Sequence, residues 1–147
     1  MNLKYMLDLG AYAPVRAHKY DAGWDLRMPY DPYSFHHEYS IEPHKSLCIN
    51  TGIHVQIPEG YVGFLKSKSG LNVTSGITSG EGVIDAGYTG PIVVKLVNNS
   101  DDTFHFKTGQ KISQLVVLPI LQFEEAEPVE CFEETERGDN GFGSTGR

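Results

Sequence analysis

Short runs of alternating apolar and polar residues occur along most of the chain. In the clearest run, TGIHVQIP at residues 51–58, Ile53, Val55 and Ile57 fall on one face of a strand, and His54 and Gln56 fall on the other. Turn-forming residues separate these runs at short and fairly even intervals, which is typical of an all-β sandwich or barrel. The pattern predicts strands at residues 3–9, 24–28, 39–42, 46–57, 61–67, 82–84, 92–98, 104–107, 112–120 and 129–133.

The pattern leaves little room for helices or for a second domain. At most one short helix is expected, after SKSGL, with Ser69 as its N-cap. We find no internal repeat and no interior linker, so residues 1–136 are expected to form one domain. Residues 137–147, RGDNGFGSTGR, are so rich in glycine that they are expected to form a flexible arm, because glycine loses the most entropy on ordering.

Composition narrows the class of protein further. The chain has 147 residues and no apolar run long enough to span a membrane or serve as a signal peptide. Two cysteines, Cys48 and Cys131, form no disulfide framework, so we expect a cytoplasmic protein. The net charge of -7 argues against broad binding to nucleic acid. Any anionic ligand must therefore meet positive charge that is concentrated locally.

Five stretches combine glycine with reactive polar groups: DAGWDLR at 21–27, KSKSGL at 66–71, GVIDAGYTGPI at 82–92, TGQKISQL at 108–115, and the C-terminal arm. Each alone is a weak signal, because a glycine beside an aspartate is usually only a turn. In order and spacing, however, the set resembles the five motifs of the trimeric dUTPase family. The resemblance runs from Asp21 to Arg147. It implies a distorted jelly-roll β-barrel, a homotrimer with shared active sites, and magnesium-assisted hydrolysis of dUTP to dUMP and pyrophosphate.

The stretch at 82–92 is expected to form a binding hairpin, with Asp85 and Tyr88 projecting from its tip. Taken alone, Asp85 fits better as a residue that only caps a turn, as turn aspartates commonly do. The resemblance implies that Asp85 contacts the sugar and activates the attacking water, and that Tyr88 packs under the deoxyribose and excludes a 2'-hydroxyl. It also implies that the hairpin reads uracil through main-chain groups, and the residues assigned to this binding are Gly82, Val83, Ile84 and Val93.

The stretch at 66–71 offers cations and hydroxyls to phosphate. By resemblance, Lys68, Ser69 and Gly70 bind the polyphosphate, although Lys68 stands where the family usually has an arginine. A lysine is a mobile point charge and positions phosphate less firmly than the arginine fork. Solvated lysines on an edge strand are the alternative. Further along, the resemblance places Gln114 near the phosphates, while Lys111 is expected to be solvated.

The first and last stretches complete the expected site. By resemblance, Asp25 reaches a magnesium ion through bound water, whereas Trp24 is expected to pack in the core. Magnesium suits so sparse a carboxylate set, since it keeps several waters and is held mainly by substrate phosphates. In the family the arm closes over the nucleotide and expels water. The arm residues that this implies are Phe142 stacking on uracil, and Arg137, Gly143, Ser144 and Thr145 contacting the nucleotide.

Two other functions stay open at this stage. The first is a dCTP deaminase, an enzyme of similar fold whose catalytic group is a glutamate on the strand after the hairpin. This chain has Lys95 at that position, and a lysine cannot replace a carboxylate base. A regulatory binding protein on the same fold would instead dock a partner, for instance through the polar and aromatic loop at 30–39. His36 and His37 in that loop suggest a metal site, but adjacent loop histidines are more often solvated than ligands.

Overall fold

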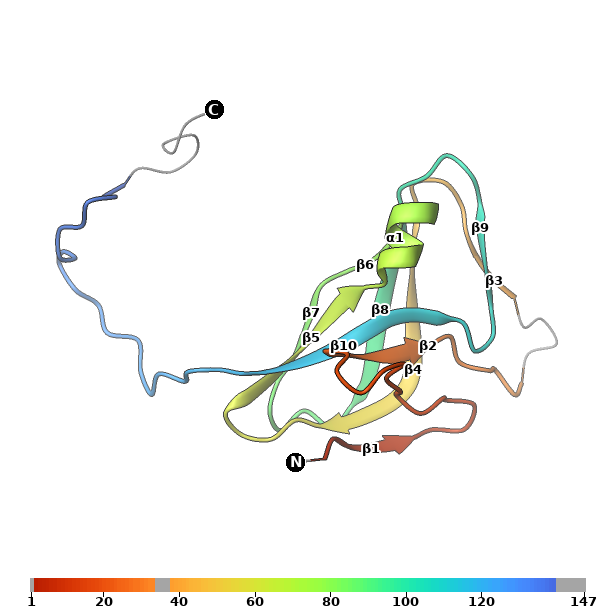
Figure 1. Cartoon of the computed structure of the whole chain (residues 1–147), viewed down its shortest axis with the longest axis horizontal. Helices are drawn as coiled ribbons and strands as arrows, with labels where there is room; N and C mark the ends of the chain where they lie inside the picture. The colour runs from red at the N-terminus through yellow and green to blue at the C-terminus, as the bar shows by residue number, and fades with distance from the viewer. Residues whose placement is uncertain (1, 34–37, 140–147) are drawn as a thin grey trace.

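The computed structural model describes residues 2–33 and 38–139. In this part of the chain, strands form two four-stranded antiparallel sheets and one two-stranded sheet (Figure 1). The first sheet has the order β1 (Lys4–Leu7), β4 (Ser46–Gln56), β8 (Pro91–Asn98), β6 (Ile77–Ser79). The second has the order β2 (Gly23–Arg27), β10 (Lys111–Pro119), β5 (Tyr61–Ser67), β7 (Gly82–Ile84). Strands β3 (Glu38–Ile41) and β9 (Phe104–Lys107) form the third sheet.

The core lies between the two larger sheets. Alternation along β4 is as expected, because Ile53 and Val55 are buried together with Ile57 just after the strand, while Gln56 is exposed. These residues join one apolar cluster with Leu65 and Leu115 of the second sheet. Each sheet thus buries one face against the other, which confirms the predicted all-β, jelly-roll-like fold.

Three details differ from the sequence prediction. Strand β6 (Ile77–Ser79) was not predicted, whereas the predicted strand at 129–133 is wrong, since these residues are exposed and irregular. A short helix, α1 (Ser69–Ser75), does follow Lys68. Its N-cap is Lys68 and Ser69 is already its first residue, so the prediction of Ser69 as the cap is also wrong. Helix α1 buries none of its residues and ends at Gly76, whose φ of 65° suits a C-cap glycine.

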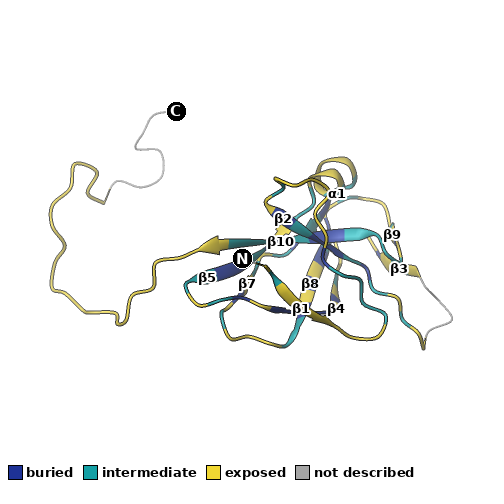
Figure 2. Ribbon diagram, turned by 60° about the horizontal axis from the view of Figure 1, so that its bottom comes forward, coloured by how far each residue is buried: buried dark blue, intermediate teal, exposed yellow. Residues whose placement is uncertain are grey.

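After β10 the chain leaves the sheets. A hydrogen bond from Ile120 N–H to the Gly60 carbonyl, 2.9 Å long, ties the end of β10 to the turn before β5. Residues 121–139 then run away from the barrel as an extended, exposed segment (Figures 1 and 2). Among the described residues, no helix is long and apolar enough to cross a membrane.

Candidate active site

A buried carboxylate held by two lysines is the centre of the first candidate pocket. Asp25 on β2 is 4% exposed. Its Oδ1 lies 2.5 Å from Lys68 Nζ and its Oδ2 lies 2.5 Å from Lys111 Nζ. These side chains line a cavity of about 380 Å³ together with Lys66, Ser69 and Gln114, among others. We call this cavity the Asp25 pocket.

The two lysines control the ionisation of Asp25. Burial by itself would raise the pKa of this carboxyl group, but the hydrogen bonds from Lys111 and Lys68 outweigh burial and lower the pKa below its ordinary value. Asp25 is therefore a carboxylate at neutral pH, and two ammonium groups face one carboxylate. The charged side chains that line the pocket are three lysines and two aspartates, Asp21 and Asp25, so one positive charge is in excess, as an anionic ligand on an acidic chain requires.

The prediction that Lys111 is merely solvated is wrong, and strand register explains why. Strand β10 has an irregularity against β2 between Lys111 and Ser113, where two residues of β10 advance while β2 advances by one. Such a bulge redirects side chains. Here it lets Ile112 and Ser113 both be buried, while Lys111 reaches Asp25.

Gln114 lies across the floor of the Asp25 pocket. Its Nε2 donates to the Ser67 carbonyl at 3.1 Å, and its side chain covers Gly23 so closely that a Cβ there would come within 2.3 Å of Gln114 Oε1. Glycine is thus required at position 23 for Gln114 to lie in the pocket. Lys66, at the rim, forms an exposed ion pair with Glu81, 2.6 Å long.

The predicted hairpin is wrong as a strand pairing, because β7 pairs with β5 in one sheet and β8 pairs with β4 and β6 in the other. The loop that joins β7 to β8, for which we keep the name hairpin, lines a second candidate pocket of about 240 Å³. We call it the hairpin pocket. It is lined by Leu65 and Pro91 and by six residues predicted from the sequence to bind substrate or act in catalysis: Gly82, Val83, Ile84, Asp85, Tyr88 and Val93. Asp85 and Tyr88 are exposed at the tip, as expected. Among the described residues, no side chain lines both pockets.

Two glycines shape the tip of this hairpin. Tyr88 N–H donates to the Asp85 carbonyl at 3.2 Å, which closes a turn with Gly87 at φ 87°, a value that L-residues rarely adopt. The Tyr88 ring lies against Gly90, where an added Cβ would come within 2.4 Å of the hydroxyl oxygen. That hydroxyl donates to the Pro91 carbonyl at 3.0 Å. The ring of Tyr88 is thereby fixed over the hairpin.

A cluster of serines beneath the Asp25 pocket was not predicted from the sequence. Ser79 N–H donates to Ser67 Oγ at 3.0 Å, and Ser113 Oγ lies 3.1 Å from the Lys66 carbonyl oxygen and 3.2 Å from Ser79 Oγ. These bonds connect β5, β6 and β10, and Ser79 and Ser113 are buried. The only signal in the sequence is that a serine lies two positions from an apolar residue in SQL at 113–115 and in ITS at 77–79, so each serine shares a strand face with an apolar residue.

The remaining predicted residues lie outside both pockets. Gly70 is exposed in the first turn of α1, and Arg137 is exposed on the extended segment after β10. The other predicted arm residues, Phe142, Gly143, Ser144 and Thr145, lie outside the described residues, as do His36 and His37. Trp24 packs against the core as expected, and the Arg16 guanidinium stacks 4.5 Å from the centre of its ring.

The side chains around Asp25 suit magnesium that is held through water and phosphate, and not magnesium bound directly by a cluster of protein ligands. The described residues contain no group of three or more His, Cys, Asp or Glu side chains that could hold a metal. Both oxygens of Asp25 already bond an ammonium group. They fit an ion that arrives with a phosphate ligand and keeps water between itself and Asp25, because each carboxylate oxygen retains a further lone pair.

Comparison with known proteins identifies the family. The dUTPase family model matches residues 11–146. The chain belongs to the dUTPase family. It is 40% identical over 141 residues to the deoxyuridine 5'-triphosphate nucleotidohydrolase of Tropheryma whipplei strain Twist, covering 94% of this chain and 91% of that enzyme. A relative from rabbitpox virus is 41% identical over 136 residues, covering 92% and 86%.

Solved dUTPase structures agree with this assignment. The dUTPase of Staphylococcus bacteriophage 80alpha with dUPNHPP superposes with a TM-score of 0.87 at 32% identity, covering 99% of both chains. A mutant dUTPase from phage phi11 of S. aureus, described as revealing the coordination of a structural Mg(II) ion, matches with a TM-score of 0.79 at 30% identity, covering 91% of this chain and all of that one.

Proposed function

We propose that this dUTPase family member hydrolyses dUTP to dUMP and pyrophosphate. The observation that carries the proposal is that six residues expected to bind or act on deoxyuridine line one cavity, the hairpin pocket. Relatives that match most of the chain are named deoxyuridine 5'-triphosphate nucleotidohydrolases, and the structure of a similar phage enzyme was solved with a dUTP analogue. The substrate is thus a deoxyuridine nucleotide carrying three phosphates.

In this proposal the hairpin supplies recognition and the general base. Main-chain groups of Gly82, Val83 and Ile84 read uracil, and the ring of Tyr88 occupies the space that a 2'-hydroxyl would need. Asp85 accepts a proton from water, whose oxygen attacks the α-phosphorus. The bond from that phosphorus to the oxygen bridging to the β-phosphate breaks, and pyrophosphate leaves. Proton transfer of this kind contributes about 10²- to 10⁴-fold in rate.

The Asp25 pocket would bind the phosphates. Lys68, with Ser69 and Gln114, offers an ammonium group, a hydroxyl and an amide, and Lys111 adds a second ammonium group beside Asp25. Charge that develops on the phosphates would be offset by these groups in fixed positions, which is where most catalysis of phosphoryl transfer arises. Magnesium, held through water by Asp25, would add Lewis-acid stabilisation of the phosphate charge.

We further propose a homotrimer in which each site takes its hairpin pocket from one subunit, its Asp25 pocket from a second and its arm, residues 137–147, from a third. Two observations support it. The two pockets are separate on one chain, and the segment after β10 exposes large apolar side chains, including Leu121, Phe123 and Phe132, that suit contact with another subunit. The cytoplasmic location stays a prediction from the sequence.

The test is turnover of each nucleoside triphosphate with magnesium, followed by release of pyrophosphate. We expect dUTP to be hydrolysed at least about a hundredfold faster than UTP, dCTP or dTTP, since a buried site that fits one set of polar groups rejects analogues strongly. Excess chelator should lower the rate sharply. Equal turnover of UTP would refute the role of Tyr88, and release of ammonia from dCTP would indicate a deaminase instead.

A further inference from the structure

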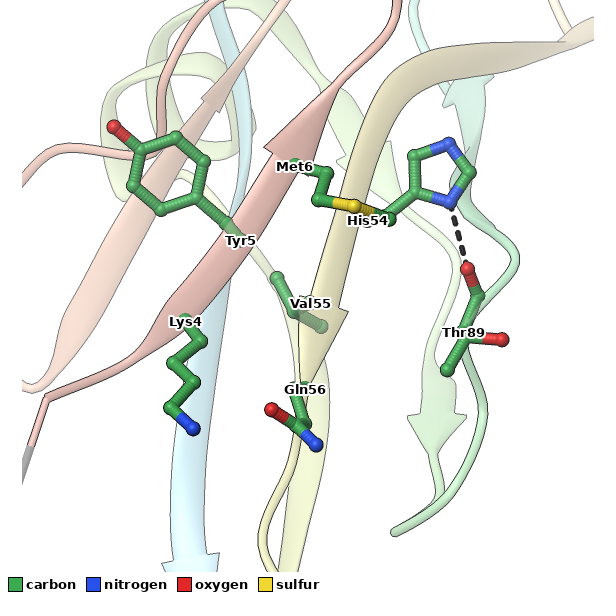
Figure 3. Close-up of a pocket in the computed structure, with 7 residues that line it drawn as sticks. All are labelled: Lys4, Tyr5, Met6, His54, Val55, Gln56 and Thr89. Atoms are coloured by element: carbon green, nitrogen blue, oxygen red, sulfur yellow. Dashed lines mark hydrogen bonds between the residues drawn. The ribbon is translucent and has the colours of Figure 1, made fainter.

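The side chain of His54 connects the hairpin to the residue that follows β1. Its Nδ1 lies 2.7 Å from the Thr89 carbonyl oxygen, and its Nε2 lies 3.2 Å from Asp8 Oδ1. Figure 3 shows the bond to Thr89 and the position of the ring between β4 and the hairpin. The His54 side chain is 19% exposed, whereas that of Asp8 is 58% exposed. One imidazole thus joins three segments of the chain.

Both partners of His54 are hydrogen-bond acceptors. A carbonyl oxygen has no proton to donate, and an ionised carboxylate has none either. A neutral imidazole carries one N–H, so it donates to one partner and turns a lone pair towards the other. Only the protonated ring donates to both. In agreement, the bonds to Thr89 and then to Asp8 raise the pKa of His54 above its ordinary value of 6.5.

This connection lies where backbone pairing fails. Strands β4 and β8 are in regular register from Ser46 to Asn50 and then shift before His54, which pairs with Pro91. Thr89 directly follows Tyr88 in the loop between β7 and β8, outside both strands. The side chain of His54 therefore supplies a link from β4 to the hairpin beside a gap in the ladder. Asp8 is itself fixed, since its N–H donates to the Gly52 carbonyl at 2.8 Å.

We propose that protonated His54 is a positioning residue that holds the Asp85–Tyr88 hairpin in its catalytic orientation, so that dUTP turnover falls when His54 loses its proton. The inference rests on the proposed function of the hairpin. His54 is not proposed to contact the substrate. It also lies outside the five stretches that carry the family resemblance.

Other charged and titratable groups near His54 belong to β1, to the segment after β1, to the hairpin and to β8. Lys4 and Tyr5 of β1 line a third pocket together with His54 and Thr89 (Figure 3), and Asp8 follows that strand. The hairpin carries Asp85 and Tyr88 near Thr89. Strand β8 places Pro91 opposite His54, and its charged residue Lys95 pairs with Cys48, farther along β4. Of these groups, Asp8 alone lies within ion-pair distance of His54, at 3.2 Å, so it is the group whose removal should shift the His54 titration most.

The sign of the pH effect follows from the raised pKa. Both hydrogen bonds of His54 form at low pH, where the ring is protonated in the folded protein, and one of them is lost as pH rises above 6.5 through the raised pKa. Turnover should therefore show an alkaline fall that belongs to His54, separate from the acidic fall expected when Asp85 is protonated.

The experiment measures kcat and KM for dUTP from about pH 5 to about pH 9 in the full-length protein and three variants. His54→Gln keeps a donor but carries no charge, so it should lower kcat about tenfold at acidic pH and abolish the alkaline fall. Asp8→Asn should keep the fall but move it to lower pH. Asp101→Asn is the matched control, since Asp101 pairs with His44 at 3.0 Å in an exposed turn, and its profile should equal that of the parent.

A separate NMR titration of the histidine side chains keeps the inference testable if His54→Gln folds poorly. One resonance should titrate above pH 6.5 at the inflection of kcat, and Asp8→Asn should move both together. An unchanged profile in His54→Gln, or an inflection that Asp8→Asn leaves in place, would overturn the role of His54 alone. Failure of the parent to hydrolyse dUTP would instead overturn the proposed function.

Discussion

At the scale of single residues, Asp25 shows how an acidic chain can gather positive charge in one pocket. Most of the net charge of -7 belongs to residues 121–147, which carry eight acidic residues and two arginines, whereas Lys68 and Lys111 converge on one buried carboxylate. Asp25 orients both ammonium groups but neutralises only one charge. In the proposed phosphate site, Lys111 adds a second ammonium group beside that of Lys68. The local field, more than net charge, decides which ligand the pocket attracts.

Replacement of Lys111 by methionine should destabilise the protein by about 1–3 kcal/mol at pH 7, because it leaves Asp25 buried with one partner. The value is below that of a fully buried pair because Lys111 is 37% exposed. Denaturant unfolding at equal protein concentration measures it. Because the pKa of Asp25 is lowered, the difference should shrink as pH falls below 3.8 and Asp25 is protonated.

Lys66→Met is the matched control for this prediction. It breaks an ion pair of similar length whose side chains are 47% and 83% exposed, so the free energy of unfolding should stay close to that of the parent. If the two substitutions destabilise the protein equally, the burial of Asp25 is not what gives its ion pairs their energetic weight.

At the scale of elements, the sequence predicted the strands best where alternation is long. Strand β4 extends over 11 residues with a clear apolar face, whereas β6 has only three residues, too few for a periodic signal. The predicted strand at 129–133 fails for another reason. Its composition suits a strand, but in this chain it has left the sheets and has no neighbour to pair with.

The parts of the candidate site that depend on residues close in sequence could be predicted, and the parts that depend on strand register could not. Hairpin residues are close in sequence, so the six residues predicted there share a pocket. The pairing of Asp25 with Lys111 depends instead on the register of β2 against β10 and on a bulge, which no local pattern reveals. His54 was placed correctly on the polar face of its strand, but its partners come from distant segments.

The turn at the hairpin tip gives a prediction at this scale. Gly87→Ala should cost about 1 kcal/mol of stability, because alanine is strained at φ 87° even though the Cβ meets open space. It should also reduce kcat/KM for dUTP about tenfold or more, since relaxing the turn moves Asp85 and Tyr88. Steady-state kinetics and thermal unfolding measure the two effects.

Gly60→Ala separates strain from function. Gly60 has a similar φ of 79° and open space around an added Cβ, but it lies in the turn before β5 and does not line the hairpin pocket. It should lose a similar amount of stability and keep the kcat/KM of the parent. Equal losses of activity in the two variants would mean that general destabilisation, and not the geometry of the hairpin, lowers the rate.

At the scale of the whole molecule, one chain by itself contains separate parts of a site. The hairpin pocket and the Asp25 pocket are distinct cavities, and the segment leading to the C-terminal arm runs away from the barrel (Figure 1). A nucleotide has its base and its phosphates only a few bonds apart, so the two pockets serve one ligand if different subunits bring them together. Assembly is then a condition of activity, and mixed trimers can test it.

Asp85→Asn should lose about 10²- to 10⁴-fold in rate through loss of the general base. A chain truncated after Glu136 should also be nearly inactive, and both should remain folded, because a terminal segment outside the core adds little to stability. Unfolding the two variants together and refolding them should produce mixed trimers, some with a site that has an intact hairpin and an intact arm. We expect activity well above the sum of the two separate variants. Differently tagged subunits that purify together yet remain as inactive as their parents would show that hairpin and arm of each site belong to the same chain.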